Sequence, residues 1–486
     1  MTDSDDAGSL SPRERRKLTR VRSDRTMIAT LAGTGLIAAF MQTLVTPIIP
    51  RLPVFLDSST ADASWVLTST LLAAAISTPI SGRLGDMYGK RRIVLILLAL
   101  LVTGSVISAL SNTLIPMVVG RVLQGFGLGV IALGISILRD VIHPKNLGGA
   151  VALVSATLGI GGALGLPLAA LIADNLDWHF LFWLGGALGL LAIVLVATII
   201  PVSTLRTGGR FDFAGALGLA IGLVCVLLAI SKATTWGLVA LGLGIAGLVV
   251  LAIWGYLELR IHDPLIDLRV AARRPVLLTN LASISVGFAF FVVSASLPVV
   301  LEAPVASGVG LGLPLLIASL CLMPLGIAMF FVSPFAARVT AARGARFSLI
   351  LGGLIITVGF AFGTVLLDEV WHALLVSTIT GIGVGFAYAA MPTLIMQSVP
   401  PTETAASNGL NSVMRTLGSS IAATIVGIIL SSQLIMVGEV AVPSRASFAW
   451  VFAVGTAVAL AGVIVGLFIP RRSPNYDTSS IPIQTP

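Results

Sequence analysis

The chain has 486 residues, of which 56% are hydrophobic and only 10% are charged. Water-soluble domains carry about 25% charged residues, so a chain of this length cannot cover two or three soluble domains with so few charges. Its hydrophobicity excludes a disordered protein. The two cysteines, Cys225 and Cys321, lie far apart in apolar runs and indicate neither a disulfide scaffold nor a metal site. We therefore expect an integral membrane protein.

The predicted membrane topology begins with a polar and basic stretch, residues 1–26, which no small-residue cleavage site follows. We expect this stretch to be a retained cytoplasmic tail. Fourteen apolar runs come next, each near the roughly 20 residues that a helix needs to cross a bilayer. They are 27–49, 64–82, 93–111, 115–139, 150–172, 181–200, 213–231, 235–255, 276–299, 311–334, 346–366, 372–396, 408–432 and 448–469. The glycine-rich pair 213–255 also suits a reentrant hairpin.

The basic residues test this arrangement, because cytoplasmic loops carry an excess of Lys and Arg. With the N-terminus inside, nearly all of the 29 Lys and Arg fall in cytoplasmic segments. The exceptions are Arg51, Lys232 and Arg445 outside, and Arg121 and Arg415 within spans. The net charge of +8 therefore follows from topology and does not indicate nucleic-acid binding.

Two internal similarities divide the chain. Residues 79–91 resemble residues 334–346, and the glycine pattern of 125–129 returns at 381–385 at almost the same offset. The offset equals eight spans, so we expect six-helix bundles at 27–200 and 276–470. A two-helix insertion with its flanking loops would occupy 201–275, and a cytoplasmic tail 471–486. Two parallel six-helix repeats with a substrate site between them are one architecture of secondary transporters.

Local motifs identify a family. The loop Gly82-Arg83-Leu84-Gly85-Asp86-Met87-Tyr88-Gly89-Lys90-Arg91-Arg92 resembles the signature loop of the major facilitator superfamily, and Arg121-Val-Leu-Gln124-Gly125 resembles a second motif, found in its proton-coupled exporters. The chain also has fourteen predicted spans, and the segments 210–215 before the two inserted helices and 263–265 after them fit the same pattern. The whole chain is therefore similar to the 14-helix drug/proton antiporter family. The resemblance implies an all-α membrane protein with the major facilitator fold, six helices plus two inserted plus six, and both termini in the cytoplasm.

The signature loop is expected to form a conformational latch. Glycines permit its tight connection, and the carboxylate of Asp86 can accept hydrogen bonds at a helix N-terminus, that of 408–432. A basic residue of the loop is expected to pair with Asp140; alternatively, the basic residues only hold the loop inside. The expected latch residues are Gly82, Arg83, Asp86, Gly89, Lys90, Arg91 and Asp140.

An arginine inside a membrane is costly and usually functional. The resemblance implies that Arg121 takes part in proton coupling, which Asp86 and Asp140 also influence, whereas a snorkelling or carbonyl-paired structural role is the alternative. The residues Gly161, Gly165 and Pro167 resemble the exporters' antiporter motif, although alanines replace its second pair of glycines. Such small residues favour close helix packing.

The cargo prediction rests on the absence of acidic residues from the middle of the predicted spans. Relatives usually place a carboxylate in the first helix, but none of the 21 acidic residues here lies near the middle of a predicted span. Lipophilic cations need a desolvated negative partner, so we expect neutral or anionic amphiphilic cargo. The expected cavity residues are Gln42, Thr43, Gln124, Asn280 and Arg415, although Gln124 suits a bond to a neighbouring helix equally well. The phenylalanines of 276–299 and 311–334 serve either the cavity or packing and lipid contact.

Other functional classes find little support. The glycines of 242–247 spell a dinucleotide fingerprint without its preceding strand, and 85–90 lacks the spacing of a phosphate-binding loop. The four histidines form no metal-ligand spacing, and the spans hold no catalytic cluster. We therefore expect neither an enzyme nor a metal, and no cofactor, with a proton gradient as the energy source.

The sequence best fits a secondary exporter of small amphiphilic molecules that works by alternating access, and the resemblance implies proton-coupled antiport. We expect a monomer in a bacterial inner or plasma membrane, with the lipid bilayer and the cargo as its partners. Two alternatives remain: a facilitator or importer of an anionic metabolite, and a non-transporting membrane sensor or lipid-organising protein.

Overall fold

The computed structural model describes residues 23–202, 211–261, 264–437 and 440–470. Most of the predicted N-terminal tail, the C-terminal tail, and the motif residues Arg210 and Asp263 lie outside the described residues. Within this part of the chain, fourteen helices are long and apolar enough to cross a membrane. The predicted number of spans is therefore confirmed.

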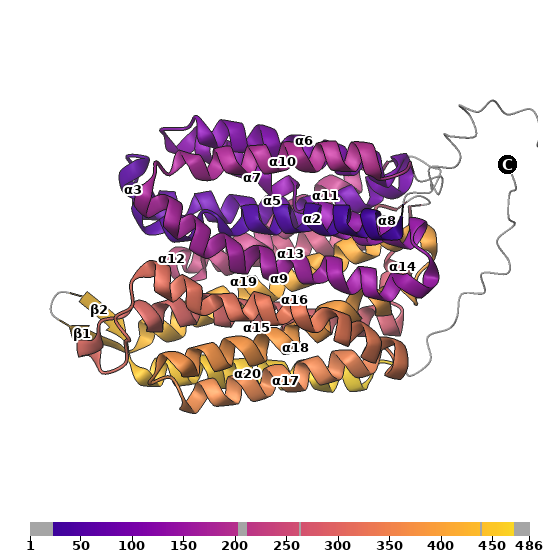
Figure 1. Cartoon of the computed structure of the whole chain (residues 1–486). Coiled ribbons are helices and arrows are strands. Elements are labelled where there is room, and N and C mark those ends of the chain that lie inside the picture. Colours follow the sequence, from indigo (N-terminus) through magenta and orange to yellow (C-terminus); the bar gives the residue numbers. More distant parts are fainter. Residues whose placement is uncertain (1–22, 203–210, 262–263, 438–439, 471–486) are drawn as a thin grey trace, which may run out of the picture.

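The first six spans form the N-terminal half, the upper, indigo-to-magenta part of Figure 1. Its spanning helices are α2 (Asp24–Thr43), α5 (Trp65–Tyr88), α6 (Lys90–Ala109), α7 (Leu114–Phe126) continued by α8 (Gly129–Val141), α9 (Pro144–Asn175) and α10 (His179–Ile199). Three short elements join α2 to α5: η2 (Thr46–Arg51), α3 (Leu52–Phe55) and α4 (Thr60–Ala63).

The inserted segment contains two spanning helices, so the reentrant hairpin that 213–255 also suited is not formed. Its elements are α11 (Phe213–Ser231), α12 (Ala233–Trp236), α13 (Leu238–Glu258) and α14 (Leu268–Ala271). The C-terminal half, orange to yellow in Figure 1, contains α15 (Arg274–Glu302), η3 (Val305–Ser307), α16 (Leu315–Arg343), α17 (Ala345–Val365), α18 (Val370–Met396), η4 (Pro401–Glu403), α19 (Thr404–Ser432) and α20 (Arg445–Leu467). A hairpin that was not predicted, antiparallel β1 (Leu434–Val437) and β2 (Val440–Pro443), joins α19 to α20.

Two predicted boundaries were wrong for local reasons. The first helix ends at Thr43 and not at 49, because the stretch that follows contains two prolines, which lack amide donors, and it forms a 3₁₀ helix. Residues 311–314 are apolar but precede α16, since the amides of 311–313 bond to carbonyls of 300–303 at the end of α15. The predicted span 115–139 is present as α7 followed by α8, and between them the amide of Leu128 bonds back to Gly125 within a glycine-rich sequence.

The internal repeat is visible in the backbone. Gly89, between α5 and α6, has a φ of 102°, and Gly344, between α16 and α17, has a φ of 88°. Such angles favour glycine, so the same residue type makes the same turn in both halves. Arg91 then donates to the carbonyl of Ala197 near the end of α10, as Arg346 does to that of Leu467 at the end of α20.

The two halves meet mainly along two helix pairs, α5 with α19 and α9 with α16, with smaller contacts of α9 with α18 and of α8 with α19. Both contacts are tight. A Cβ on Gly82 would lie 2.7 Å from the carbonyl oxygen of Ala405, and one on Gly326 only 2.0 Å from that of Gly159. We call the end of the bundle that holds Asp86 and the start of α19 the Asp86 end, predicted to be cytoplasmic, and the opposite end the Trp65 end.

Candidate functional site

The predicted latch joins the two halves at the Asp86 end. Asp86, on the last turn of α5, is 2% exposed, and its Oδ2 accepts a hydrogen bond of 3.3 Å from the amide of Ala406. Ala406 lies in the first turn of α19, where amides have no partner within the helix. The contact that the sequence predicted between Asp86 and this helix N-terminus is therefore present.

Lys90 is the basic residue that pairs with Asp140. Its Nζ lies 2.7 and 2.9 Å from the two carboxylate oxygens of Asp140, and 3.7 Å from Oδ1 of Asp86. All three side chains are at least 97% buried. One lysine thus lies between two carboxylates and links α5 and α6 to α8. Arg83 interacts electrostatically with Asp86 and with Glu403, which directly precedes α19.

The sequence did not predict a role for Arg139, which also contacts the start of α19. We call the contacts of Asp86 and Arg139 with α19 the gate. The Arg139 guanidinium donates to the hydroxyl of Thr404, the first residue of α19, and to the carbonyl of Val399 at 3.3 Å. The only signal in the sequence is its place beside Asp140, because a basic residue at a predicted cytoplasmic boundary is explained by topology alone. Arg139 thus adds a further polar connection between the halves at this end, beside that of Asp86.

Arg121 is buried within the N-terminal half. It is 1% exposed, and it donates to Gln124 Oε1 at 2.7 Å and to the carbonyl oxygens of Val66 and Met41 at 3.3 and 3.4 Å. Gln124 in turn donates to Ser105 Oγ at 2.9 Å. This cluster joins α2, α5, α6 and α7. The carbonyl contacts match the structural alternative for Arg121, and the helix-bonding alternative for Gln124; a role in proton coupling stays a prediction.

A second buried polar cluster lies in the C-terminal half. Asn411, at its centre, donates to Asn280 Oδ1 at 3.0 Å and to Ser283 Oγ at 2.6 Å, and it accepts from Arg415 at 2.7 Å. The Arg415 guanidinium lies 5.0 Å from the centre of the Tyr388 ring, which permits a cation–π interaction. Asn280 and Arg415 are thus brought together through Asn411, which sequence reasoning missed although it lies one helical turn before Arg415.

The first helix packs closely against α9 near Gln42 and Thr43, both of which are partly exposed. A Cβ on Gly165 would lie 2.0 Å from Thr43 Oγ1, and one on Gly161 would lie 2.6 Å from Ala39 Cβ. The expected role of these glycines in close packing therefore has a direct structural basis. Pro167 is buried inside α9, which continues to Asn175.

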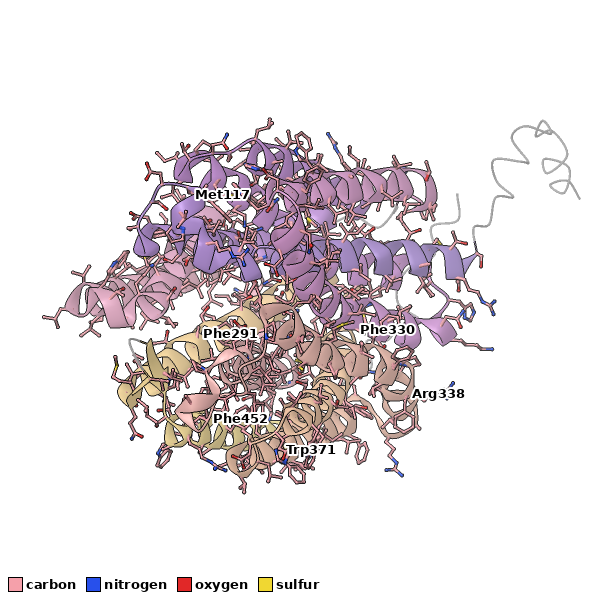
Figure 2. All side chains as sticks on the ribbon, turned by 60° about the vertical axis from the view of Figure 1, so that its left-hand side comes forward. Met117, Phe291, Phe330, Arg338, Trp371 and Phe452 are labelled. Atoms are coloured by element: carbon pink, nitrogen blue, oxygen red, sulfur yellow. The ribbon has the colours of Figure 1, made fainter. Side chains whose placement is uncertain are left out.

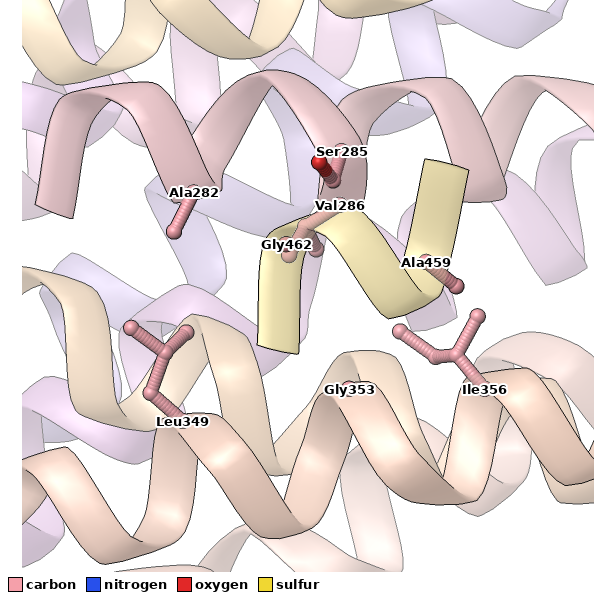
Figure 3. Close-up of a pocket in the computed structure, with 8 residues that line it drawn as sticks. All are labelled: Ala282, Ser285, Val286, Leu349, Gly353, Ile356, Ala459 and Gly462. Atoms are coloured by element: carbon pink, nitrogen blue, oxygen red, sulfur yellow. The ribbon is translucent and has the colours of Figure 1, made fainter. Parts of the chain in front are cut away.

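The structure does not join the two arginine clusters into one site. Arg121 contacts α2 and α5, whereas Arg415 contacts α18 and residues of its own helix. A small cavity among α15, α17 and α20 lies within the C-terminal half and is lined mainly by apolar or small residues, Ser285 being the polar one (Figure 3). Its lining and position do not suit a substrate site between the halves.

The phenylalanines of α15 and α16 have mixed environments. Phe288 is 2% exposed and belongs to the core of the C-terminal half, whereas Phe331 is 73% exposed on the outer surface. In Figure 2, Phe291 and Phe330 lie along the side of the C-terminal half that borders the N-terminal half. Of this set, Phe291 and Phe330 are therefore the better candidates to face a cavity between the halves.

The family follows from comparison with known proteins. The family model described as Major Facilitator Superfamily matches residues 31–423. The chain belongs to the major facilitator superfamily. This family and its fold indicate a transporter rather than an enzyme, and the fourteen spans make it a multi-pass protein of the cell membrane.

Relatives within the superfamily carry names that refer to resistance and export. Multidrug resistance protein 3 of Bacillus subtilis is 25% identical over 75% of this chain and 71% of its own length. A multidrug resistance protein B homolog of Mycobacterium tuberculosis is 27% identical over 77% of this chain and 70% of its own. The tetracenomycin C resistance and export protein of Streptomyces glaucescens is 27% identical over 85% and 77%.

Solved structures show the same fold. The human organic anion transporter MFSD10 (TETRAN) aligns with a TM-score of 0.65 at 15% identity, covering 91% of this chain and 99% of that one. The proton:xylose symporter XylE aligns with a TM-score of 0.64 at 14% identity, covering 92% and 96%. The major facilitator fold predicted from the sequence is confirmed.

Proposed function

We propose that this transporter exports small amphiphilic molecules by alternating access, with the halves 27–200 and 276–470 rocking about a central cavity. The observation that carries the proposal is the gate at the Asp86 end. There polar contacts join the two halves, among them Asp86 with Ala406 and Arg139 with Thr404, and they can break and re-form without unfolding either half. The export names of the relatives support the direction of transport.

We further propose that export is coupled to proton influx, as in the 14-helix drug/proton antiporter family. Arg121, Asp86 and Asp140 are the residues expected to influence this coupling. Asp86 and Asp140 share Lys90, so a change in the protonation of either carboxylate alters how firmly this gate is held. They act as gating residues and need not carry the proton themselves.

The cargo we propose is neutral or anionic. Both intramembrane arginines are met, among the residues that the structure describes, by amide, hydroxyl, carbonyl or aromatic groups rather than by carboxylates. A cationic substrate entering between them would meet two positive charges and no desolvated negative partner. In this proposal the protein acts as a monomer, since the central cavity is formed between the two halves of one chain.

Transport by purified protein in proteoliposomes tests the proposal. A lumenal pH dye reports proton flux while cationic, neutral and anionic amphiphiles are offered under an imposed pH gradient. We expect proton flux that appears only with neutral or anionic compounds. Compound movement without proton flux would instead favour a facilitator, and binding without movement would favour a sensor.

A single substitution tests the cargo preference separately. Gln42→Glu places a carboxylate on α2, in the region where relatives of this family usually have one. We expect it to raise transport of lipophilic cations at least several-fold relative to anions. Unchanged selectivity in a variant that is monodisperse and still transports its original cargo would contradict the proposed preference.

A further inference from the structure

The inserted helices contain a buried pair of acidic residues for which the transport proposal has no use. Glu258, the last residue of α13, is only 2% exposed. Asp212 directly precedes α11 and caps it, its Oδ1 accepting the amide of Gly215 at 2.8 Å. The two side chains come from opposite ends of the inserted helix pair, which brings both to the Asp86 end.

In each carboxyl group, one oxygen accepts a hydrogen bond from a backbone amide, and the other has no donor among the described residues. Oε1 of Glu258 accepts the amide of Ile266 at 3.0 Å. Oδ2 of Asp212 and Oε2 of Glu258 are buried and, within the described part of the chain, have no donor. Both free oxygens border Gly215, whose added Cβ would lie 2.1 Å from Oδ2 of Asp212 and 3.0 Å from Oε2 of Glu258, so the two carboxyl groups face the same small space.

Two ionised carboxylates cannot satisfy one another, because each is only an acceptor. At close range in a buried place, their like charges also repel. One proton shared between Oδ2 and Oε2 removes both problems, since a protonated carboxyl becomes a donor to the other group. A proton is therefore the ligand whose chemistry fits the two free oxygens.

Among the residues that the structure describes, the neighbouring charged groups have other partners. Arg269 donates to the carbonyl of Leu259, Arg260 lies 4.4 Å from the ring centre of Tyr256, and Asp267 caps α14. On the adjacent elements, Arg83 of α5 interacts with Asp86, and Arg415 of α19 lies over Tyr388. Among the described residues, Asp212 is the charged group that acts on Glu258.

The pair also fixes a loop that touches both halves. Through the amide of Ile266, Glu258 holds residues 264–267, of which Leu265 and Ile266 are 1% and 3% exposed. These side chains form a core with α11 that includes Val413 of α19, with Ile80 of α5 packed against it. The carboxyl pair thus anchors an apolar contact that spans the α5–α19 boundary.

We propose that Asp212 and Glu258 form a proton-binding site, in which one shared proton holds residues 264–267 against α11 and α19. With the proton bound, one carboxyl group donates to the other and these residues are anchored. Loss of the proton at alkaline pH leaves two facing buried carboxylates that repel each other, so the stability of the folded protein falls as the pH rises.

Two measurements on detergent-purified full-length protein test this site without any assay of transport. Infrared difference spectra between about pH 5.5 and about pH 8.5 should contain the C=O band of a protonated, buried carboxyl that disappears at alkaline pH. The apparent Tm should fall by about 2 °C or more over the same range. Glu258→Gln supplies a permanent amide donor to Asp212, so it should remove this band and flatten the pH dependence of Tm.

Asp212→Asn makes the reciprocal change and is expected to act like Glu258→Gln, which guards against poor folding of either variant. Glu302→Gln is the matched control, since Glu302 is an exposed acidic residue at the C-terminal end of α15, far from the pair. This variant should leave the band and the pH dependence of Tm as in the wild type. A wild type without the band, or a band as intense in both monodisperse pair variants as in the wild type, would overturn the proposal.

Discussion

Asp86→Asn is the most direct test of the gate. In the structure, the Asp86 carboxylate accepts the amide of Ala406 in the first turn of α19 and lies 3.7 Å from Lys90. Hydrogen bonds to charged groups contribute about 1.5–3 kcal/mol, and a negative charge at a helix N-terminus contributes up to about 2 kcal/mol. The asparagine keeps an oxygen acceptor but loses the charge, so we expect the closed gate to lose about 1–2 kcal/mol. That loss raises the ratio of open to closed molecules about 5- to 30-fold.

The change can be measured as a distance between spin labels across the Asp86 end. Lys145 at the start of α9 and Ala342 at the end of α16 are exposed and lie in different halves, so cysteines there can carry the labels once Cys225 and Cys321 are replaced by serine. Asp174→Asn, which removes an exposed carboxylate paired with Arg51 at the Trp65 end, is the matched control. An open fraction in Asp86→Asn equal to that of the wild type and the control would refute the reasoning.

Two further predictions concern packing and buried charge. Gly161→Leu should lower the apparent Tm, because overpacking of a close helix contact costs about 1–3 kcal/mol; Gly242→Leu, at a glycine with no heavy atom within 4 Å of its added Cβ, should leave Tm nearly unchanged, and equal effects would contradict the packing argument. Lys90→Met leaves the buried Asp140 carboxylate without its lysine and should cost about 3–5 kcal/mol in thermal or denaturant unfolding. A loss below about 1 kcal/mol, typical of surface pairs, would show that the lysine is not essential there.

The parts of the fold that could be predicted from the sequence are those set by local pattern. Span number follows from the length of apolar runs, and the repeat follows from the paired turns at Gly89 and Gly344. The pattern fails where hydrophobicity does not distinguish helix from extended chain. Residues 311–314 are apolar, yet they bond across to α15, and hydropathy alone contains no information on such long-range pairing.

For the site, the sequence predicts residue types better than partners. The Asp86 contact could be predicted because the resemblance singles out this loop, and a carboxylate is stabilised by accepting hydrogen bonds from the amides at a helix N-terminus. Arg139 and Glu258 could not, because a charged residue at the end of an apolar run looks the same whether it faces water or is buried by a returning loop. Glu258 is covered because the segment after α13 folds back and places Leu265 and Ile266 in the core.

These contacts also change how the inserted helices should be regarded. α11 lies against α5 and α19, one of the two helix pairs along which the halves meet. At the Trp65 end, the carbonyl of Ile230 accepts from Thr424 of α19, while Lys232, just after α11, donates to Ser64, just before α5. Any movement that parts α5 from α19 must therefore break the contacts of the insertion with one of them. The apolar core around Leu265 draws more of its side chains from α19 than from α5, whereas at the Trp65 end Lys232 and Trp236 lie against Trp65 of α5. The insertion is therefore tied to both halves, more to α19 at the Asp86 end and more to α5 at the Trp65 end, so its contacts oppose separation of the halves at either end.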